Sequence, residues 1–428
     1  MGAPFWVLWD HAYVWGLLAC RGLLALGAPF RVVSGAAVAA GALARHHPAA
    51  LIVPGGFARR RFAALGAAGA AAIRDYVAAG GTYFGVCGGA GLALSRSGGL
   101  DLCPWVRRTF TDRLDHLVSG HVRLLADTAS PLFPPELPGE LAAPVWWPSG
   151  FVPPDGAAAD DGVAILATYA GAAADLLLAD IPLGAMSEAA LAACRQRFGL
   201  RLAPAFLDGG ACLIGGRFGR GRYVLSHAHL ETPDSPAANI WLAHLLGVFA
   251  GGEVFGRVIP AWRPEREPAC WEDVHLAAAR RDMAALLAAG FAQRLLFRRT
   301  DWLLGWRPGL PGFPLSSLAV LLAGVTAWPR TPVGDAYWRQ AGPVFAAQFA
   351  DFARRVEAFF PAKRLAITRS LVAGPDDGIG ALAAEQTALF GDGPAGGGVC
   401  GELIRLLDGL LVRLLPNAWP APASSGRG

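Results

Sequence analysis

Up to about residue 250, short apolar runs alternate with longer segments in which apolar residues recur at helical spacing. The apolar runs predict strands at 5–9, 30–33, 50–53 and 82–86. Helical spacing occurs at 14–26 and at 63–79, and Gly80-Gly81 ends the second helix. Because strands and helices alternate, this order predicts an α/β fold with a mostly parallel sheet and helices on both faces.

The pattern weakens and then returns before residue 250. Residues 101–160 are less regular and rich in proline and tryptophan. Strands are expected again at 163–169, 211–214 and 223–226, with residues 215–221 as the hairpin turn between the last two. A closing helix is expected at 237–249, where Gly251-Gly252 ends it.

After Pro260 the periodicity becomes helical throughout. Helices are expected at 271–297, 315–322, 337–360, 378–390 and 399–415, with joints rich in glycine and proline. The sequence therefore predicts three parts: an α/β domain at 1–255, an α-helical C-terminal domain at 256–415, and a disordered tail at 416–428.

Composition limits the classes of partner. Of the 428 residues, 54% are hydrophobic and only 16% are charged, which favours a large core over disorder. The net charge is +4 and Lys363 is the only lysine. Short arginine groups such as Arg59-Arg60-Arg61 are typical of a solvated face. We therefore expect no nucleic-acid partner.

The cysteines and the apolar segments bear on compartment. The seven cysteines are odd in number and include no C-x-x-C pair, which argues against disulfides and cysteine zinc sites. We expect no metal and no cofactor. The N-terminus lacks a basic leader pattern, and the longest apolar run, 315–328, is too short to cross a bilayer. A cytoplasmic protein without membrane contact is expected.

The segment Gly85-Val86-Cys87-Gly88-Gly89 has the pattern of a nucleophile elbow. The strand at 82–86 would deliver Cys87 to an edge of the sheet, and the flanking glycines permit a turn too tight for β-carbons. The N–H of Gly88 would face a developing oxyanion, and the helix that follows would favour a thiolate. A cysteine that is only a small buried hydrophobic residue is the alternative.

A cysteine nucleophile needs a base, and the segment 223–231 offers the best-placed histidines. Its strand ends just before His227 and His229, at the edge where the elbow is expected. Residues two apart on an extended segment face the same side, so Glu231 can orient His229 and support its charge. We expect His229 to be the base, with His227 as the rival; loop histidines bound to backbone groups are the alternative.

These motifs together resemble the class I glutamine amidotransferase-like fold. Pro54-Gly55-Gly56, the Cys87 elbow and His229-Leu230-Glu231 carry the resemblance, although the family has proline where Leu230 stands. More narrowly, Gly80-Gly81 ahead of the elbow and the hairpin at 219–226 are similar to the same segments of the biotin–protein ligase N-terminal-domain family. The resemblance covers about residues 1–250.

This resemblance implies a flavodoxin-like sheet and a Cys-His-Glu triad. It implies Cys87 as the nucleophile, His229 as the base and Glu231 as the orienting acid. It also implies that Gly56 and Gly88 supply the oxyanion N–H groups. The remaining pocket candidates are Gly55, Gly89, Trp146, Trp147 and His227. The tryptophans, and Phe151 beside them, are open to a second interpretation as local packing.

Ligase activity itself is not expected. Gly219-Arg220-Gly221-Arg222 resembles the loop that binds biotinyl-adenylate in biotin ligases, but here it lies in a predicted hairpin and the chain has one lysine. The expected function is that of a cysteine-dependent amidohydrolase, similar to glutamine amidotransferases and acting through a thioester. The alternatives are a non-catalytic ligand-binding module and a related cysteine peptidase or acyl hydrolase. The substrate would be a small-molecule or peptide amide; a protein partner that accepts ammonia is left open.

Overall fold

The computed structural model describes residues 2–95, 98–108, 117–155, 162–199, 202, 204–307, 310, 312–370, 377–392 and 396–415. The predicted tail at 416–428 lies outside the described residues. The chain divides into two compact units, Met1–Ala261 and Trp262–Gly428.

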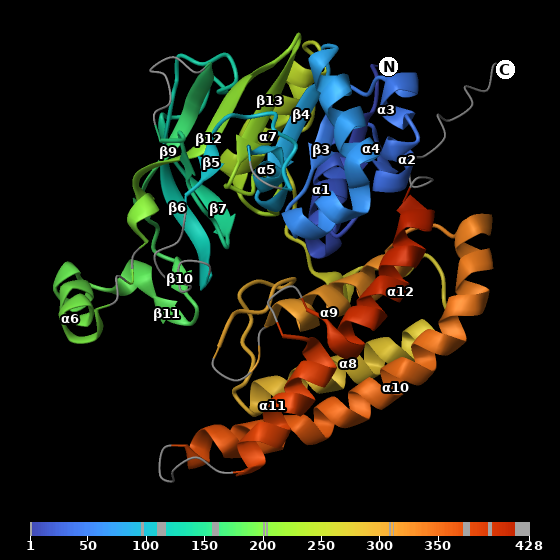
Figure 1. Ribbon diagram of the computed structural model, residues 1–428. Helices are drawn as coiled ribbons and strands as arrows, with labels where there is room; N and C mark the ends of the chain where they lie inside the picture. The colour runs from blue at the N-terminus through green and yellow to red at the C-terminus, as the bar shows by residue number, and fades with distance from the viewer. Residues whose placement is uncertain are drawn as a thin grey trace. The chain divides into compact units, whose positions relative to one another are not determined.

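The first unit is built on a parallel sheet that carries the elbow (Figure 1). Its strands are β1 (Phe5–Leu8), β2 (Phe30–Val33), β3 (Leu51–Val53), β4 (Thr82–Val86) and β13 (Gly221–Ser226). They lie in the order β2-β1-β3-β4-β13, and every neighbouring pair is parallel. This is the flavodoxin-like order, so the predicted fold class is confirmed. Ligands of such sheets bind beyond the carboxyl ends of the strands, where Pro54 and Cys87 follow β3 and β4.

Beyond β13 the same sheet continues with antiparallel strands, so that as a whole it is mixed. This extension runs β12-β9-β6-β10-β11, while β7 pairs with β6, and β8 pairs with β12 and β5. Its strands are β5 (Val106–Arg107), β6 (Val118–Ala126), β7 (Glu140–Trp146), β8 (Phe151–Val152), β9 (Val163–Ala172), β10 (Leu177–Leu178), β11 (Ile181–Pro182) and β12 (Asp208–Phe218).

The extension differs from the sequence prediction in two places. The stretch described as less regular contains the long hairpin β6–β7, in which Gly120 and Pro144 weaken the strand pattern. The turn expected at 215–221 is wrong in its first part, because β12 continues to Phe218 and the chain reverses at Gly219-Arg220. Gly216 lies within β12, opposite Tyr223 of β13. Glycine is required at this position because the ring of Tyr223 occupies the space that a β-carbon would need.

Helices cover both faces of the parallel sheet. They are α1 (Tyr13–Leu26), α2 (Gly35–Ala39), α3 (Ala42–His46), α4 (Ala58–Ala78), α5 (Gly88–Ala93) and α7 (Pro236–Phe249). The helix α6 (Glu188–Phe198) follows β11 in the chain and lies beyond the antiparallel extension, away from the parallel sheet (Figure 1). Tyr83 of β4 belongs to the core that also contains Ile73 of α4 and Ala90 of α5. Its neighbour Phe84 faces the other way and packs its ring 5.8 Å from that of Phe249 in α7.

The second unit is helical in its described residues. It contains α8 (Val274–Ala292), α9 (Gly312–Ala327), α10 (Pro332–Arg369), α11 (Asp377–Phe390) and α12 (Gly398–Leu414). The rings of Phe345, Phe349 and Phe352 lie in sequence along α10, and Phe390 of α11 packs on the last of them. None of the helices in the described part of the chain is both long and apolar enough to cross a membrane.

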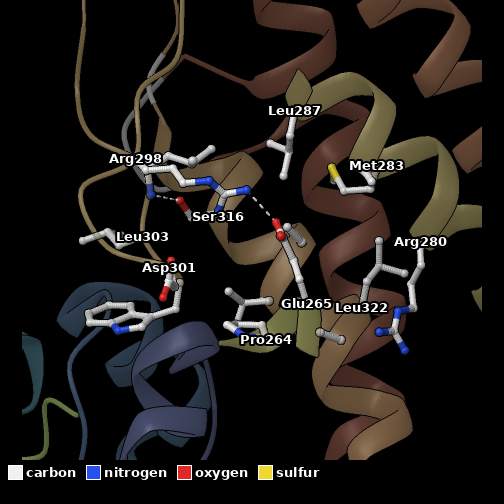
Figure 2. A pocket seen from close by; sticks show the side chains of 16 residues that line it. Pro264, Glu265, Arg280, Met283, Leu287, Arg298, Asp301, Leu303, Ser316 and Leu322 are labelled. Carbon is white, nitrogen blue, oxygen red and sulfur yellow. Dashed lines mark hydrogen bonds and ion pairs between the residues drawn. The ribbon is translucent and has the colours of Figure 1, made fainter. Parts of the chain in front are cut away.

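A pocket lies within the second unit, lined by residues of α8 and α9 and by residues 298–304 (Figure 2). Met283 and Leu287 give it an apolar wall, and Arg298 is paired with Glu265 at 2.7 Å. Among the described residues, no cysteine or histidine lines this pocket. It therefore lacks the nucleophile and base that the sequence motifs indicate.

Candidate active site

Cys87 forms the turn between β4 and α5 in a strained backbone conformation. Its φ of 50° and ψ of −108° lie in a region that residues with a side chain rarely adopt. The backbone N–H of Cys87 donates to Ser226 O at 2.7 Å, which ties the turn to the end of β13. The side chain is partly exposed, whereas Cys20, Cys103, Cys212 and Cys400 are buried. The strand-turn-helix geometry is that of a nucleophile elbow.

The glycines around the elbow are required by close backbone contacts. A β-carbon at Gly88 would overlap the carbonyl oxygen of Gly56, and one at Gly89 would overlap that of Val53. The elbow and the loop after β3 are therefore packed backbone against backbone. Within the described residues, neither the N–H of Gly56 nor that of Gly88 has a hydrogen-bond acceptor. Two free N–H groups on adjoining loops are the donors that an oxyanion would need.

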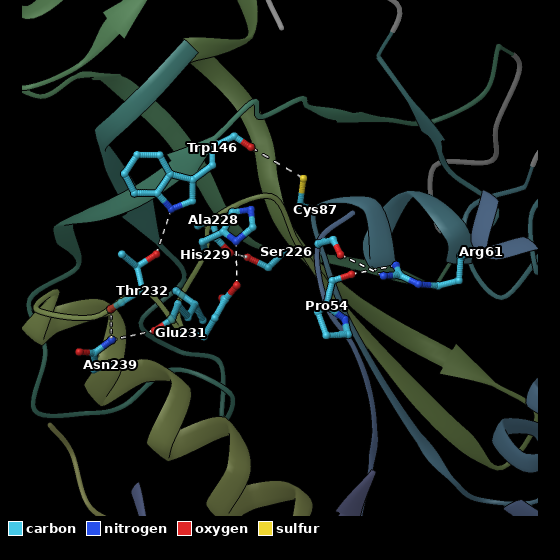
Figure 3. Close-up of polar contacts among 12 residues, drawn as sticks. Pro54, Arg61, Cys87, Trp146, Ser226, Ala228, His229, Glu231, Thr232 and Asn239 are labelled. Atoms are coloured by element: carbon cyan, nitrogen blue, oxygen red, sulfur yellow. Dashed lines mark hydrogen bonds and ion pairs between the residues drawn. The ribbon is translucent and has the colours of Figure 1, made fainter. Parts of the chain in front are cut away.

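His229 and Glu231 form a buried pair. Nδ1 of His229 lies 2.7 Å from Oε1 of Glu231, and the two side chains are 0% and 6% exposed (Figure 3). The remaining ring nitrogen, Nε2, is buried and has no hydrogen-bond partner within the described part of the chain. The indole of Trp15 in α1 packs on the imidazole at 4.7 Å between ring centres. Gly55 fits against both rings, where a β-carbon would crowd them.

The environment of His229 favours its charged form. Burial by itself lowers the pKa of His229, but the Glu231 carboxylate and Cys87 raise it, and the net shift is upward. Figure 3 shows Cys87 and His229 in the same part of the site, and no hydrogen bond to Nε2 of His229 is formed among the described residues. The site thus contains a buried carboxylate, an imidazole that this carboxylate orients, and a thiol carried by a strained backbone turn.

The turn that holds this pair is fixed by hydrogen bonds in place of a proline. Nδ2 of Asn239 in α7 donates to Leu230 O at 2.9 Å and to Thr232 O at 2.8 Å. Nε1 of Trp146 donates to the hydroxyl of Thr232 at 3.1 Å, and the N–H of His229 donates to Pro144 O at 2.8 Å (Figure 3). Sequence reasoning missed Asn239. Its one signal is an amide on the buried face of an otherwise apolar helix.

His227 has a different environment from His229. It is 3% exposed, and its ring stacks on that of Phe151 at 4.3 Å between centres. Neither of its ring nitrogens has a hydrogen-bond partner among the described residues. Burial, together with Arg107 and His229, lowers the pKa of His227 to about 3. His227 is therefore neutral at ordinary pH and has no carboxylate to support a charge.

Trp146 and Trp147, both expected to line the pocket, differ in which of their atoms lie near Cys87. The carbonyl oxygen of Trp146 lies 3.9 Å from Sγ of Cys87, while its indole is buried against Thr232. Trp147 is partly exposed, has a φ of 57°, and meets Trp15 edge to face at 6.0 Å. The main chain of Trp146 and the ring of Trp147 thus lie around the site, whereas the ring of Trp146 belongs to the core.

The burial of Arg61 contradicts the expectation that the Arg59-Arg60-Arg61 group lies on a solvated face. Arg59 and Arg60 are exposed as expected, but Arg61 is 0% exposed. It lies on the face of α4 that also carries Leu65 and Ile73, at the four-residue spacing of a buried stripe. That spacing, with the preceding Pro54-Gly55-Gly56 loop, is the signal by which the sequence could have indicated it.

Comparison with known proteins bears on the family. Residues 33–97 match the family model described as Biotin-protein ligase, N terminal. The predicted resemblance is confirmed over this segment. It contains Gly56, Arg61 and Cys87, and stops before His229. No curated protein matches the chain.

Two solved structures are similar to a part of the chain. A protein from Thermoplasma acidophilum assigned as a GMP synthase subunit has 12% identity and a TM-score of 0.37; the match covers 58% of this chain and 95% of that one. The structure of PurLQS from Thermotoga maritima has 14% identity and a TM-score of 0.36, covering 58% of this chain and 98% of that one.

The site has no evident metal ligands. Across the described residues, no three or more His, Cys, Asp or Glu side chains gather in a way that could hold a metal ion. Figure 3 draws the thiol of Cys87 in the same view as the imidazole of His229 and its partner, the carboxylate of Glu231. These are the groups of acyl-transfer chemistry.

Proposed function

We propose that the chain is a cysteine-dependent amidohydrolase of the glutamine amidotransferase-like class, with Cys87, His229 and Glu231 as its triad. The observation that carries the proposal is the buried His229–Glu231 pair, whose free Nε2 remains for Cys87. A buried polar atom without a partner destabilises the fold by about 1–3 kcal/mol. A role in catalysis accounts for an arrangement that has this cost.

In the first step, Sγ of Cys87 attacks the carbonyl carbon of an amide. The raised pKa of His229 favours an imidazolium beside the anionic sulfur. As the tetrahedral intermediate forms, the N–H groups of Gly56 and Gly88 stabilise its oxyanion. His229 then gives its Nε2 proton to the leaving nitrogen, the C–N bond breaks, and ammonia or an amine departs from a thioester on Cys87.

In the second step, water attacks the thioester carbonyl. His229, now neutral, takes a proton from the water, and the same two N–H groups stabilise the second oxyanion. The C–S bond breaks, a carboxylic acid is released, and the Cys87–His229 pair is restored. Glu231 orients the imidazole and supports its charge throughout, without taking a proton.

The test is release of ammonia from a panel of primary amides that includes glutamine, with thioesters and peptides as further substrates. The wild type should turn over at least one amide, and Cys87→Ala should reduce turnover to background. Cys270→Ala is the matched control, because Cys270 is an exposed cysteine in the second unit.

Other outcomes separate the alternatives. Cleavage of peptides without release of ammonia from small amides would indicate a cysteine peptidase. Absence of turnover, together with iodoacetamide labelling of Cys270 but not of Cys87, would contradict the proposal and favour a ligand-binding module.

A further inference from the structure

Arg61 is a buried cation bound to the loop beside the elbow. Its Nη1 donates to Pro54 O at 2.9 Å, and its Nη2 donates to Gly55 O at 3.0 Å. Its Nε donates to Asp10 O at 2.9 Å, in the segment that follows β1. Figure 3 shows the guanidinium directed at the carbonyl of Pro54. One side chain thus ties the loop after β3 to the loop after β1.

The bond to Gly55 sets the direction of the neighbouring N–H. The carbonyl of Gly55 and the N–H of Gly56 belong to one planar trans peptide unit, in which C=O and N–H point in opposite directions. When Arg61 holds that carbonyl, the N–H of Gly56 is turned away from the guanidinium. Gly56 has a φ of 126°, where glycine alone is unstrained, so the peptide needs an external restraint.

The charge of Arg61 also needs an explanation. Its hydrogen bonds go to neutral carbonyls, and a buried cation without a bonded anion is costly. Burial lowers the pKa of Arg61 to about 10, while Tyr83, Asp10 and Cys87 act in the opposite direction. Arg61 therefore stays charged at neutral pH.

We propose that Arg61 is a positioning residue of the Cys87 site: it holds the Gly55–Gly56 peptide so that the Gly56 N–H serves as an oxyanion donor. This inference rests on the proposed function. A purely structural arginine would stabilise the fold equally well, but its loss would not lower kcat in protein that remains folded.

The test uses the full chain with Arg61→Met, Arg61→Lys and the control Arg59→Met. Arg59 is the exposed arginine two residues away on the same helix. Two sets of quantities are measured at neutral pH. The first is the rate at which iodoacetamide labels Cys87, and the second is kcat and KM for an amide of the panel that the wild type turns over. Circular dichroism establishes that each variant is folded.

Arg61→Met removes the bonds that hold the Gly55–Gly56 peptide, so its kcat should fall by about 10²-fold with KM little changed, as when an oxyanion donor is lost. Arg61→Lys keeps the charge but not the three bonds, so its kcat should fall by a similar factor. Labelling of Cys87 forms no oxyanion, so its rate should stay near the wild-type value in both variants. Arg59→Met should match the wild type in both measurements.

A wild-type kcat in folded Arg61→Met would overturn the inference. If that variant does not fold, Arg61→Lys decides: an unchanged kcat overturns the positioning role, and a selective loss of kcat supports it. Failure of the proposed function is distinct, because it would appear in the wild type as an unreactive Cys87.

Discussion

Gly88 lies so close to Gly56 that a β-carbon on Gly88 would overlap the carbonyl oxygen of Gly56. This contact joins the elbow to the loop after β3 and places their two free N–H groups on adjoining segments. The site therefore depends on a backbone fit between two loops as much as on its side chains.

The first prediction concerns this contact. Gly88→Ala should force the two loops apart, lowering the free energy of unfolding by about 1–3 kcal/mol through overpacking. It should lower kcat by about 10²–10³-fold, because the shifted N–H no longer serves the oxyanion. Kinetics and denaturant unfolding measure the two effects.

Gly91 provides the matched control. It lies one turn along the same helix, and a β-carbon there would meet no atom within 4 Å. Gly91→Ala should leave kcat unchanged and should not destabilise the fold. Equal loss of activity in both variants would contradict the specific role of the Gly88 contact.

The second prediction distinguishes the two histidines. His229→Ala should lower turnover by at least about 10³-fold, because members of a catalytic unit fail together. His227→Ala should change turnover at most a few-fold, since His227 is neutral and has no carboxylate partner. Steady-state kinetics on the two variants check this. The reverse order of severity would mean that His227 is the base.

The third prediction is a pH dependence of stability. The pKa of His229 is raised above its unfolded value in the folded protein, so the pair contributes most below the unfolded value of about 6.5. Between the unfolded value and the folded-state pKa, His229 keeps its proton in the folded state but loses it in the unfolded state. The free energy of unfolding should therefore decline as pH rises toward the folded-state pKa of His229.

This dependence is best measured in a Cys87→Ala background, where the thiol does not titrate. Urea unfolding from pH 6 upward should show the decline, and Glu231→Gln should flatten it because the raising carboxylate is gone. A decline of equal slope in Glu231→Gln would assign it to other groups.

The fourth prediction concerns Asn239. Asn239→Ala removes two buried hydrogen bonds to the 229–232 turn and should cost about 1–3 kcal/mol of stability. In folded protein it should also slow labelling of Cys87 by iodoacetamide, since His229 loses its fixed position. Thermal unfolding and labelling rates measure both. A destabilised variant with unchanged labelling would limit Asn239 to the fold.

Local pattern was sufficient for the elements that build the parallel sheet. The strand at 82–86 has the bounds of β4, and the glycines around Cys87 indicated a tight turn because few other structures need them. The sequence suggested the pairing of His229 with Glu231 on the premise of an extended segment. The structure instead has a turn at 229–232, closed by a bond from the N–H of Thr232 to His229 O at 3.0 Å, and this turn brings the two side chains to 2.7 Å.

Tertiary structure decided what depends on contacts distant in the sequence. Arg61 is buried because carbonyls after β1 and β3 converge on it, and a run of three arginines contains no sign of that convergence. Asn239 and Trp15 reach His229 and its turn from two separate helices. The β6–β7 hairpin was missed because Gly120 in β6 and Pro144 in β7 are residue types that argue against a strand when only the sequence is considered. The sequence by itself indicated the candidate residues Cys87, His229 and Glu231, because their motifs are local; packing of remote segments decided which residues hold them in place.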